Sequence, residues 1–300
     1  MIQAELVQRL DGFFDTSLFD ERDYWSGLLS AADVRIYQAF AEPEFLDGGW
    51  NGLMLNSSRE IDRVYMSVFP DEKVLDTVLA MELERAAPGS LIFAHYPADL
   101  QESGGGFVGV QEAQLEALRE HNISYYCCHA PLDSHPAISP VSALARALKL
   151  TDVESFGPGG HEMTGIHGKL RETSFSTLAG RVAEVTELPS LHYSQVRFNA
   201  LPVEHVAVVS GSGEPADYLA SVRDLGCDTY VTGSWWPRGD TEDVAVRQAA
   251  LRELVPTLPM NLLGTSIYAS EMVVLRDQMP AWFRNAGIDA RLVRQPDPWR

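Results

Sequence analysis

Short apolar runs alternate along this chain with longer stretches of helical spacing. Apolar runs of about four to eight residues are typical of buried strands. The predicted strands are Val64–Phe69, Leu91–Ala94, Ile123–Cys128, Val203–Ser210, Thr229–Thr232 and Met260–Gly264. The predicted helices are Lys73–Arg85, Val110–Glu120, Pro215–Asp224 and a last helix from about Ser270 to Asn285. Strands that alternate with helices build βα units, so the pattern predicts an α/β fold rather than a sandwich or a helical bundle.

A glycine-rich stretch interrupts this alternation between residues 155 and 175. Phe156–Gly160 and Gly165–Leu170 both carry the signals of loops and turns. A chain of 300 residues is long enough for two domains. We therefore expect a first α/β domain over residues 1–150 and a second α/β region over residues 151–300. His161 and His167 lack metal-ligand spacing and are predicted to be surface or loop residues.

Three separate strand ends carry a side chain that can bind a metal ion: His95, Asp133 and Glu271. Each has an ordinary interpretation when taken alone. His95 would be a hydrogen-bonded residue at a strand end, Asp133 a turn residue, and Glu271 a carboxylate facing the positive end of a helix. Because α/β proteins place their ligand-binding loops after strands, the three together favour one shared site for a divalent ion. The C-terminal segment would then contribute Glu271 to a site carried mainly by residues 1–150.

Local sequence predicts how these groups are held. His129 and Asp133 are four residues apart, and Pro131 between them argues against a continuous helix, so both are expected on a shaped loop. Glu271 is expected in the first turn of the last helix. Gly211 and Gly213 follow a strand and precede a helix, where backbone N–H groups can hold a phosphate. The alternative for these two glycines is a simple tight turn, because the sequence lacks a third glycine and the Lys of a P-loop.

Charge and cysteine content limit the partners and the compartment. The formal net charge of −19 disfavours nucleic acids and anionic membranes, since both would be repelled. Three cysteines form neither a disulfide framework nor a zinc pattern, which is typical of a reducing compartment. The N-terminal residues are acidic and amphipathic, unlike a secretion signal, and no apolar run reaches the length of a membrane span. A cytoplasmic protein is expected.

The order of several segments resembles the Nif-three-like family, also known as GTP cyclohydrolase I type 2-like proteins. The resemblance extends from Trp50 to Glu271, and no single motif carries it. The matching segments are Trp50–Met54, Leu91–Pro97, His129–Pro136, Gly165–Leu170, Val206–Gly213, Tyr230–Gly233 and Tyr268–Glu271.

This resemblance implies two linked α/β domains with mixed sheets, a metal site in the cleft between them and a ring-shaped homohexamer. It also implies two metal ions, held in the family by paired His residues, an Asp, and a late His and Glu. Carried over by position, His95, Asp133 and Glu271 are retained. Tyr96 replaces the second paired His, and Ile267 replaces the late His. The resemblance therefore implies a reduced, mononuclear site, with His129 either orienting Asp133 or joining as a fourth ligand.

The expected function is that of a metal-binding protein. One imidazole and two carboxylates suit Zn, Mn, Fe or Mg without selecting one. One hypothesis is metal-dependent hydrolysis of a nucleotide or another phosphorylated small molecule, in which His129 or His135 moves a proton. The other is a non-catalytic role in metal storage or delivery, or as a scaffold.

Overall fold

The structure is a computed structural model that describes residues 1–85, 89–157, 165–191 and 195–299. His161 and the last three residues of the predicted loop Phe156–Gly160 lie outside the described residues. The strands form two five-stranded sheets and a small two-stranded ribbon. The first sheet has the order β1 (Gly52–Leu55), β6 (Ile123–Cys127), β3 (Ser90–Ala94), β2 (Arg63–Ser67), β12 (Asp289–Leu292). The second has the order β11 (Asn261–Gly264), β10 (Thr229–Ser234), β9 (Val203–Ser212), β8 (Gly165–Thr173), β7 (Thr151–Phe156), and the ribbon pairs β4 (Asp99–Gln101) with β5 (Gly106–Val108).

Both large sheets are mixed, as expected for the fold class. In the first sheet β6, β3, β2 and β12 run parallel and β1 runs antiparallel to β6. In the second sheet β9, β10 and β11 run parallel, while β8 and β7 form an antiparallel extension. The strand β3 is buried at all five positions, because it lies in the middle of its sheet and its side chains are covered on both faces. The predicted division after residue 150 falls just before β7 and stays a prediction, although β12 returns to the first sheet.

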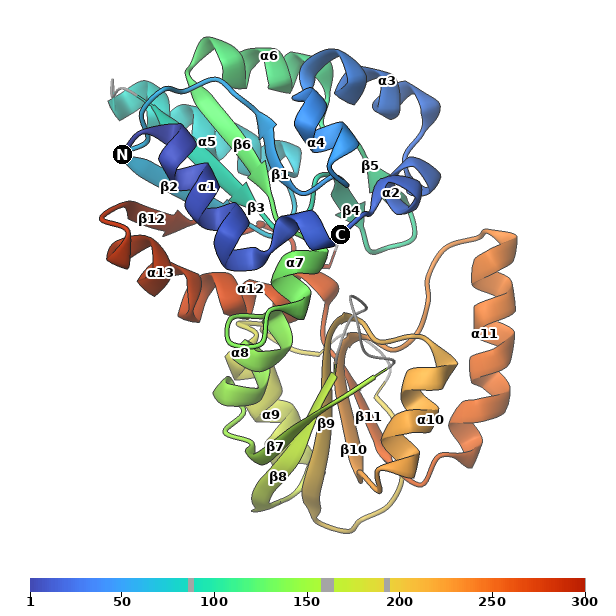
Figure 1. The fold of residues 1–300 in the computed structure, drawn as a ribbon. Helices are drawn as coiled ribbons and strands as arrows, with labels where there is room; N and C mark the ends of the chain where they lie inside the picture. Colours follow the sequence, from blue (N-terminus) through green and yellow to red (C-terminus); the bar gives the residue numbers. More distant parts are fainter. Residues whose placement is uncertain (86–88, 158–164, 192–194, 300) are drawn as a thin grey trace.

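Thirteen α-helices within the described residues cover these sheets (Figure 1). Their bounds are α1 (Gln3–Phe14), α2 (Arg22–Leu28), α3 (Ala31–Phe40), α4 (Pro43–Asp47), α5 (Glu72–Arg85), α6 (Glu112–Glu120), α7 (Ala130–Ser134), α8 (Pro140–Ala147), α9 (Phe175–Val185), α10 (Ala216–Asp224), α11 (Glu242–Leu254), α12 (Ile267–Asp277) and α13 (Met279–Asn285). In Figure 1 the helices α1 to α6 and α13 surround the first sheet, and α9 to α11 flank the second.

The helix α12 joins the two halves of the molecule. It lies between the sheets in Figure 1 and contacts α8, α13, β2, β9 and β10. Every residue of α12 from Tyr268 to Leu275 is buried, because neighbouring elements cover the helix on all sides. One hydrophobic cluster accordingly includes residues of the first sheet, of α12 and of β9. The side chains of α12 are therefore fixed relative to both sheets.

Most predicted elements are confirmed within a few residues, and three expectations are wrong. Gly165–Leu170 is not a turn but the first part of β8, so His167 is a strand residue with a side chain only 12% exposed. The last predicted helix is two helices, α12 and α13, because Pro280 in the first turn of α13 cannot continue a helix. Pro131 does not prevent a helix either, since it lies in the first turn of α7, where a missing N–H costs nothing.

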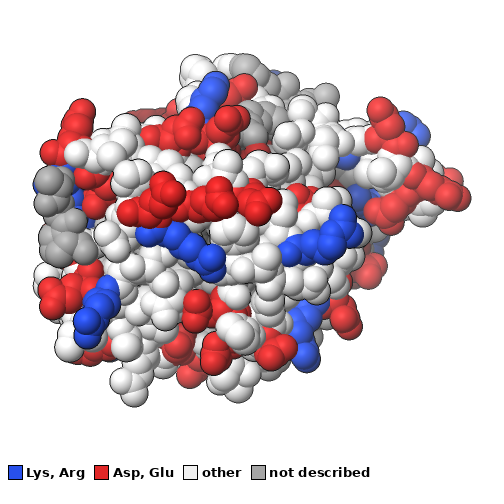
Figure 2. All heavy atoms as spheres, turned by 90° about the horizontal axis from the view of Figure 1, so that it is seen from above, with Lys and Arg blue, Asp and Glu red and all other residues white. Residues whose placement is uncertain are grey.

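The molecular surface carries the acidic excess of the sequence. On the face shown in Figure 2, Asp and Glu side chains are widely spread and Lys and Arg lie scattered among them. The expectation of no nucleic-acid partner stays a prediction. None of the helices in the described part of the chain is long and apolar enough to cross a membrane.

Candidate metal centre

The fold brings His95, Asp133 and Glu271 together at the junction of the two sheets. His95 directly follows β3, and its side chain is fully buried. Its Nε2 lies 3.3 Å from Oδ1 of Asp133, and its Nδ1 lies 3.4 Å from Oε2 of Glu271. One imidazole is therefore placed between two carboxylates that come from distant parts of the chain.

Asp133 is positioned by the short helix α7, which begins immediately after His129. The N–H of Asp133 donates to the carbonyl of His129, so one helical turn sets their spacing. Nε2 of His129 lies 3.8 Å from Oδ2 of Asp133. One donor atom from each of His95, His129 and Asp133 lies within 4.8 Å of the others, which makes the three residues a group that could hold a metal ion.

Glu271 is positioned by α12, whose first residue is Ile267. Ser266 caps this helix by accepting a hydrogen bond from the N–H of Ala269. Glu271 is the fifth residue of α12 and not part of its first turn, so the prediction about its place was wrong. Its side chain is only 2% exposed, and the helix dipole alone does not account for a carboxylate at this depth.

Four polar atoms of the site are buried and have no hydrogen-bond partner among the described residues: Nδ1 and Nε2 of His95, Oδ1 of Asp133 and Oε2 of Glu271. These atoms face each other at 3.3 and 3.4 Å but are not aligned as hydrogen bonds. Unpaired buried polar atoms are costly, and native proteins rarely keep several in one place. A cation can bind one nitrogen of His95 together with a carboxylate oxygen, while the other nitrogen keeps a proton that faces the second carboxylate. The donor set therefore fits a metal ion.

The charges of the site also favour a bound cation. Burial lowers the pKa of His95, but the carboxylates of Asp133 and Glu271 outweigh burial and raise it to about 10. Burial raises the pKa of Glu271, and the positive charge of His95 opposes that rise. The two carboxylates therefore favour a positive charge at His95, and a metal cation that replaces one of its ring protons would supply that charge.

Sequence reasoning missed Glu21, which supports His129 from the N-terminal segment. Its Oε1 lies 2.6 Å from Nδ1 of His129, and its Oε2 accepts hydrogen bonds from the N–H of Ala130 and the amide of Asn51. Burial opposes a charged His129, but Glu21 raises the pKa of its imidazole overall. Glu21 directly precedes α2, and no local motif marks it as a partner of a residue 108 positions away.

Tyr96 and Ile267 occupy the positions at which the family resemblance implies imidazoles. The Tyr96 hydroxyl donates a hydrogen bond of 2.9 Å to Oε1 of Glu271. Burial, followed by the charge of Glu271, raises the pKa of Tyr96 well above its ordinary value. Tyr96 therefore acts as a neutral donor that orients Glu271, and Ile267 offers no ligand atom.

Two cavities meet the site. One of about 630 Å³ is lined by Glu21, Tyr24, Tyr96, His129 and Asp133. Another of about 320 Å³ is lined by Asp133 and His135. Asp133 therefore borders both cavities.

His135 lies at the end of α7 and is held away from His95. Its ring stacks on Phe13 with centroids 4.4 Å apart, and its Nδ1 accepts the N–H groups of Ala137 and Ile138. Burial lowers the pKa of His135. The geometry thus favours His129 over His135 as the imidazole closest to the site.

Gly211 and Gly213 have partners inside the protein. The N–H of Gly211 donates to Oγ of Ser270, and the N–H of Gly213 donates to the carbonyl of Ser234. A Cβ at Gly211 would lie 2.3 Å from Oε1 of Glu271, so this glycine gives Glu271 its space. The predicted phosphate cradle stays a prediction without support from these two N–H groups.

The fold and the site define an α/β protein with side-chain groups that can hold a metal ion. A family model described as Duf34/NIF3 (NGG1p interacting factor 3) matches residues 33–236, more than half of the chain. The chain belongs to this family, as the resemblance implied. The matched segment includes His95 and Asp133, while Glu21 and Glu271 lie outside it.

Individual relatives agree with this assignment. The chain is similar to a GTP cyclohydrolase 1 type 2 homolog from Deinococcus radiodurans, with 28% identity over 189 residues, 62% of this chain and 67% of the relative. A homolog of the same name from Pyrococcus abyssi is 29% identical over 189 residues, 62% of this chain and 70% of the relative.

Solved structures show the same fold at low identity. The Staphylococcus aureus hypothetical protein SA1388 gives a TM-score of 0.64 at 16% identity, covering 100% of this chain and 99% of that one. TTHA1606 from Thermus thermophilus gives 0.62 at 20% identity, covering 99% of both chains. Both comparisons cover nearly the whole chain, so the described architecture is the fold of these two structures.

Proposed function

We propose that this protein binds one divalent metal ion among His95, Asp133 and Glu271, in the cleft between its two α/β halves. The ion is expected on the Nε2 side of His95, with Asp133 as a ligand and His129 beside it, while Glu271 faces the protonated Nδ1. The observation that carries the proposal is the set of four buried polar atoms on His95, Asp133 and Glu271 that have no hydrogen-bond partner in the described part of the chain. Tyr96 and Ile267 support a single ion, because they stand where the family resemblance implies the two imidazoles needed for a second ion.

The donor set restricts the chemistry. Two carboxylates and an imidazole suit Mn, Fe, Mg or Zn. An ion bound there would supply Lewis-acid activation of a water or a substrate oxygen. Glu21 holds His129 with Nε2 towards Asp133, so His129 is placed to accept or release a proton at the wall of the larger cavity.

We infer that the activity is metal-dependent hydrolysis of a small phosphorylated molecule, with a nucleotide as the first class to test. The name of the relatives supports this class, and the aromatic wall formed by Tyr24 and Tyr96 suits a planar base. The cavity of about 630 Å³ is of the size found for small-molecule sites.

A panel of nucleotides and phosphoesters, assayed with Mn, Zn and Fe, tests the hydrolase proposal. We expect turnover that depends on the metal and is lost in Glu271→Ala, while the exposed-site control Glu184→Ala keeps it. Turnover that Glu271→Ala leaves intact would contradict the proposal. If the protein binds metal but turns over no compound of the panel, a role in metal storage or delivery would replace the hydrolase proposal.

A further inference from the structure

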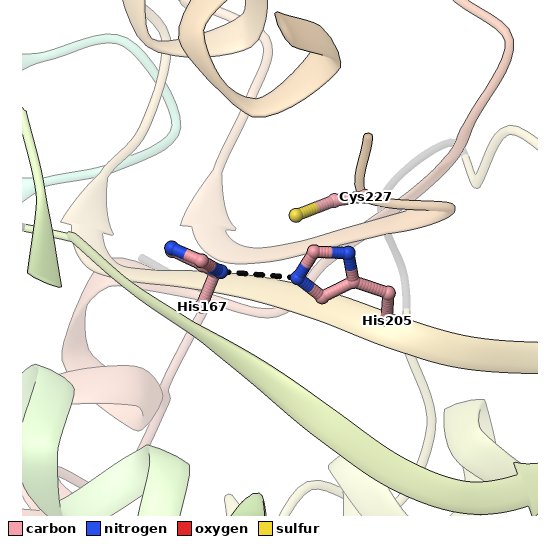
Figure 3. Close-up of side chains that lie close together, drawn as sticks. All are labelled: His167, His205 and Cys227. Atoms are coloured by element: carbon pink, nitrogen blue, oxygen red, sulfur yellow. Dashed lines mark hydrogen bonds between the residues drawn. The ribbon is translucent and has the colours of Figure 1, made fainter. Parts of the chain in front are cut away.

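A second group of metal-competent side chains lies in the second sheet: His167, His205 and Cys227 (Figure 3). One ligand atom from each lies within 4.8 Å of the others. His167 is on β8, His205 is near the start of β9, and Cys227 lies in the loop between α10 and β10. The group therefore joins three segments of the chain.

This group is separate from the candidate metal centre. His205 lies near the amino end of β9, whereas Gly211, which contacts Glu271, lies near its carboxyl end. Six residues of extended strand span roughly 20 Å. The two groups thus lie near opposite ends of β9 and cannot share an ion.

The two imidazoles are placed by strand register. His167 pairs with Ala207, so His205, two residues away, is its diagonal neighbour on the same face of the sheet. Nδ1 of His167 lies 3.0 Å from Nε2 of His205. In a tetrahedral zinc site two ligand nitrogens are about 3.3 Å apart, so only a small displacement separates the observed spacing from that geometry.

The backbone around the group is held by several hydrogen bonds. Oδ2 of Asp228 accepts the N–H groups of Glu204 and His205, each at 2.8 Å. The N–H of Asp228 in turn donates to the carbonyl of His205 at 2.9 Å. Cys227, which precedes Asp228, is therefore fixed next to the start of β9.

The hydrogen bonds also favour the tautomer that a metal needs. Nδ1 of His205 lies 3.3 Å from the carbonyl of Gly226, an acceptor that requires the proton on Nδ1 and leaves the lone pair on Nε2. Nε2 of His167 lies 3.9 Å from a carboxylate oxygen of Glu154, directly opposite on β7. When Nδ1 of His167 binds an ion, the ring proton is carried on Nε2. The carboxylate of Glu154 can then accept a hydrogen bond from this N–H group, as carboxylates do behind zinc-bound histidines.

Burial and donor softness define the ion. Cys227 is 4% exposed, and the two imidazoles are partly exposed, so an ion can enter from the side of the histidines. A thiolate with two imidazoles suits zinc better than Mg or Mn. Binding would release the thiol proton to solvent and form a Zn–S bond, with a water completing four ligands.

We propose that His167, His205 and Cys227 form a zinc site, with three protein ligands and a water, that ties β8, β9 and the loop before β10 together. Its place at the amino edge of the parallel strands, away from the cavities of the candidate metal centre, supports a stabilising role. The site is independent of the proposed function, because it shares no residue with it.

Cobalt(II) tests this site without relying on activity, because a thiolate ligand gives a sulfur-to-cobalt charge-transfer band in the near ultraviolet. The full-length chain is freed of metal with a chelator and titrated with Co²⁺. We expect a band whose full intensity corresponds to one thiolate-bound Co²⁺ per chain. In Asp133→Ala, where the first centre is weakened, the band should saturate at about one equivalent. Cys227→Ser should abolish the band, and Asp133→Ala should leave it unchanged.

Two results would overturn the zinc site: no charge-transfer band in the unmodified chain, or a band of full intensity in Cys227→Ser. Circular dichroism establishes that each variant is folded. His167→Gln, on a partly exposed strand position, provides a second variant if Cys227→Ser does not fold, and it should weaken Co²⁺ binding by more than about 10-fold. In a matched melting experiment, Zn²⁺ should raise the Tm of Asp133→Ala but not that of the folded double variants Asp133→Ala/Cys227→Ser or Asp133→Ala/His167→Gln, in which both sites are removed.

Discussion

The candidate metal centre and the His167–His205–Cys227 group use different donors in different surroundings. The first combines an imidazole with two carboxylates, is closed between two sheets, and adjoins cavities of about 630 and 320 Å³. The second combines two imidazoles on neighbouring strands of one sheet with a thiol in the loop before β10. The first lies where the carboxyl ends of parallel strands meet, and the second lies at their amino ends.

This difference separates a site that can act on a ligand from one that can stabilise the fold. In open α/β sheets, ligand sites lie beyond the carboxyl ends of the strands. Oxygen donors next to a cavity leave room for a substrate, whereas an ion bound by a thiolate and two imidazoles would connect three segments of the second half of the chain. The first three predictions below change the candidate metal centre and compare each variant with a matched control; the fourth changes an ion pair on α12 outside both regions.

The largest effect is expected from Asp133→Ala. It removes the carboxylate closest to Nε2 of His95, so Mn²⁺ affinity at the first centre should fall by more than about 100-fold. Isothermal titration calorimetry measures the affinity, with the exposed Asp76→Ala as the matched control. Unchanged Mn²⁺ binding in Asp133→Ala would remove Asp133 from the ligand set.

Gly211→Ala should disturb the first centre through shape alone. Gly211 has a φ of +67°, and an added Cβ would lie 2.3 Å from Oε1 of Glu271. Gly226 has a similar φ of +71° but nothing within 4 Å of an added Cβ, so Gly226→Ala isolates the cost of the backbone conformation. We expect Gly226→Ala to cost about 1 kcal/mol in the free energy of unfolding and Gly211→Ala to cost more and weaken Mn²⁺ binding. Equal unfolding free energies and equal Mn²⁺ affinities for the two variants would contradict the close packing of Gly211 and Glu271.

Glu21→Gln should have an intermediate effect. Loss of the carboxylate removes the charge that raises the pKa of His129 and weakens its orientation. An orienting partner of a ligand is worth about 10-fold or more in metal affinity. The exposed neighbour Asp20 gives the control Asp20→Asn. Competition dialysis with Mn²⁺ gives the ratio of the metal affinities of the two variants. A Glu21→Gln protein with the affinity of its control would leave Glu21 a purely structural residue.

The smallest effect is expected at Glu187, which binds Arg294 and, on α12, Arg276. These arginines, Arg294 first, lower the pKa of Glu187 in the folded protein. Because the pKa of Glu187 is lower in the folded protein, its ionised carboxylate stabilises the fold at pH values above the unfolded pKa of about 4.3. This stabilisation is lost as the pH falls through the folded pKa. Because the pair is more than a third exposed, Glu187→Gln should cost only about 0.5 kcal/mol at pH 7. Urea unfolding at pH 7 and pH 3 should show the difference at the higher pH alone; a difference that grows towards pH 3 would contradict this sign.

The fold was largely predictable because its signals are local. The fully buried strand β3 and the helix α5 follow from apolar runs and helical spacing, and the structure confirms both. The split between α12 and α13 was not predicted, although Pro280 at the start of α13 has no N–H with which to continue the preceding helix. The strand β8 was missed because two glycines in Gly165–Leu170 carry turn signals that sheet pairing overrides.

The sites were predictable only in part because their geometry is long-range. His95, Asp133 and Glu271 follow strands, and this local position was enough to group them. Glu21 reaches His129 through the packing of N-terminal helices, and His167 meets His205 through strand register, neither of which the linear sequence displays. The role of Gly211 depended on knowing where Glu271 lies.

Anomalous X-ray diffraction from crystals soaked in Mn²⁺ tests the central claim most directly, because it counts and locates ions without reference to activity. Mn²⁺ suits oxygen donors and binds thiolates poorly. The account predicts one anomalous peak per chain at the candidate metal centre, bounded by His95, Asp133 and Glu271, and no peak at Cys227. Two peaks at this centre, or none at saturating Mn²⁺, would contradict a single-ion site.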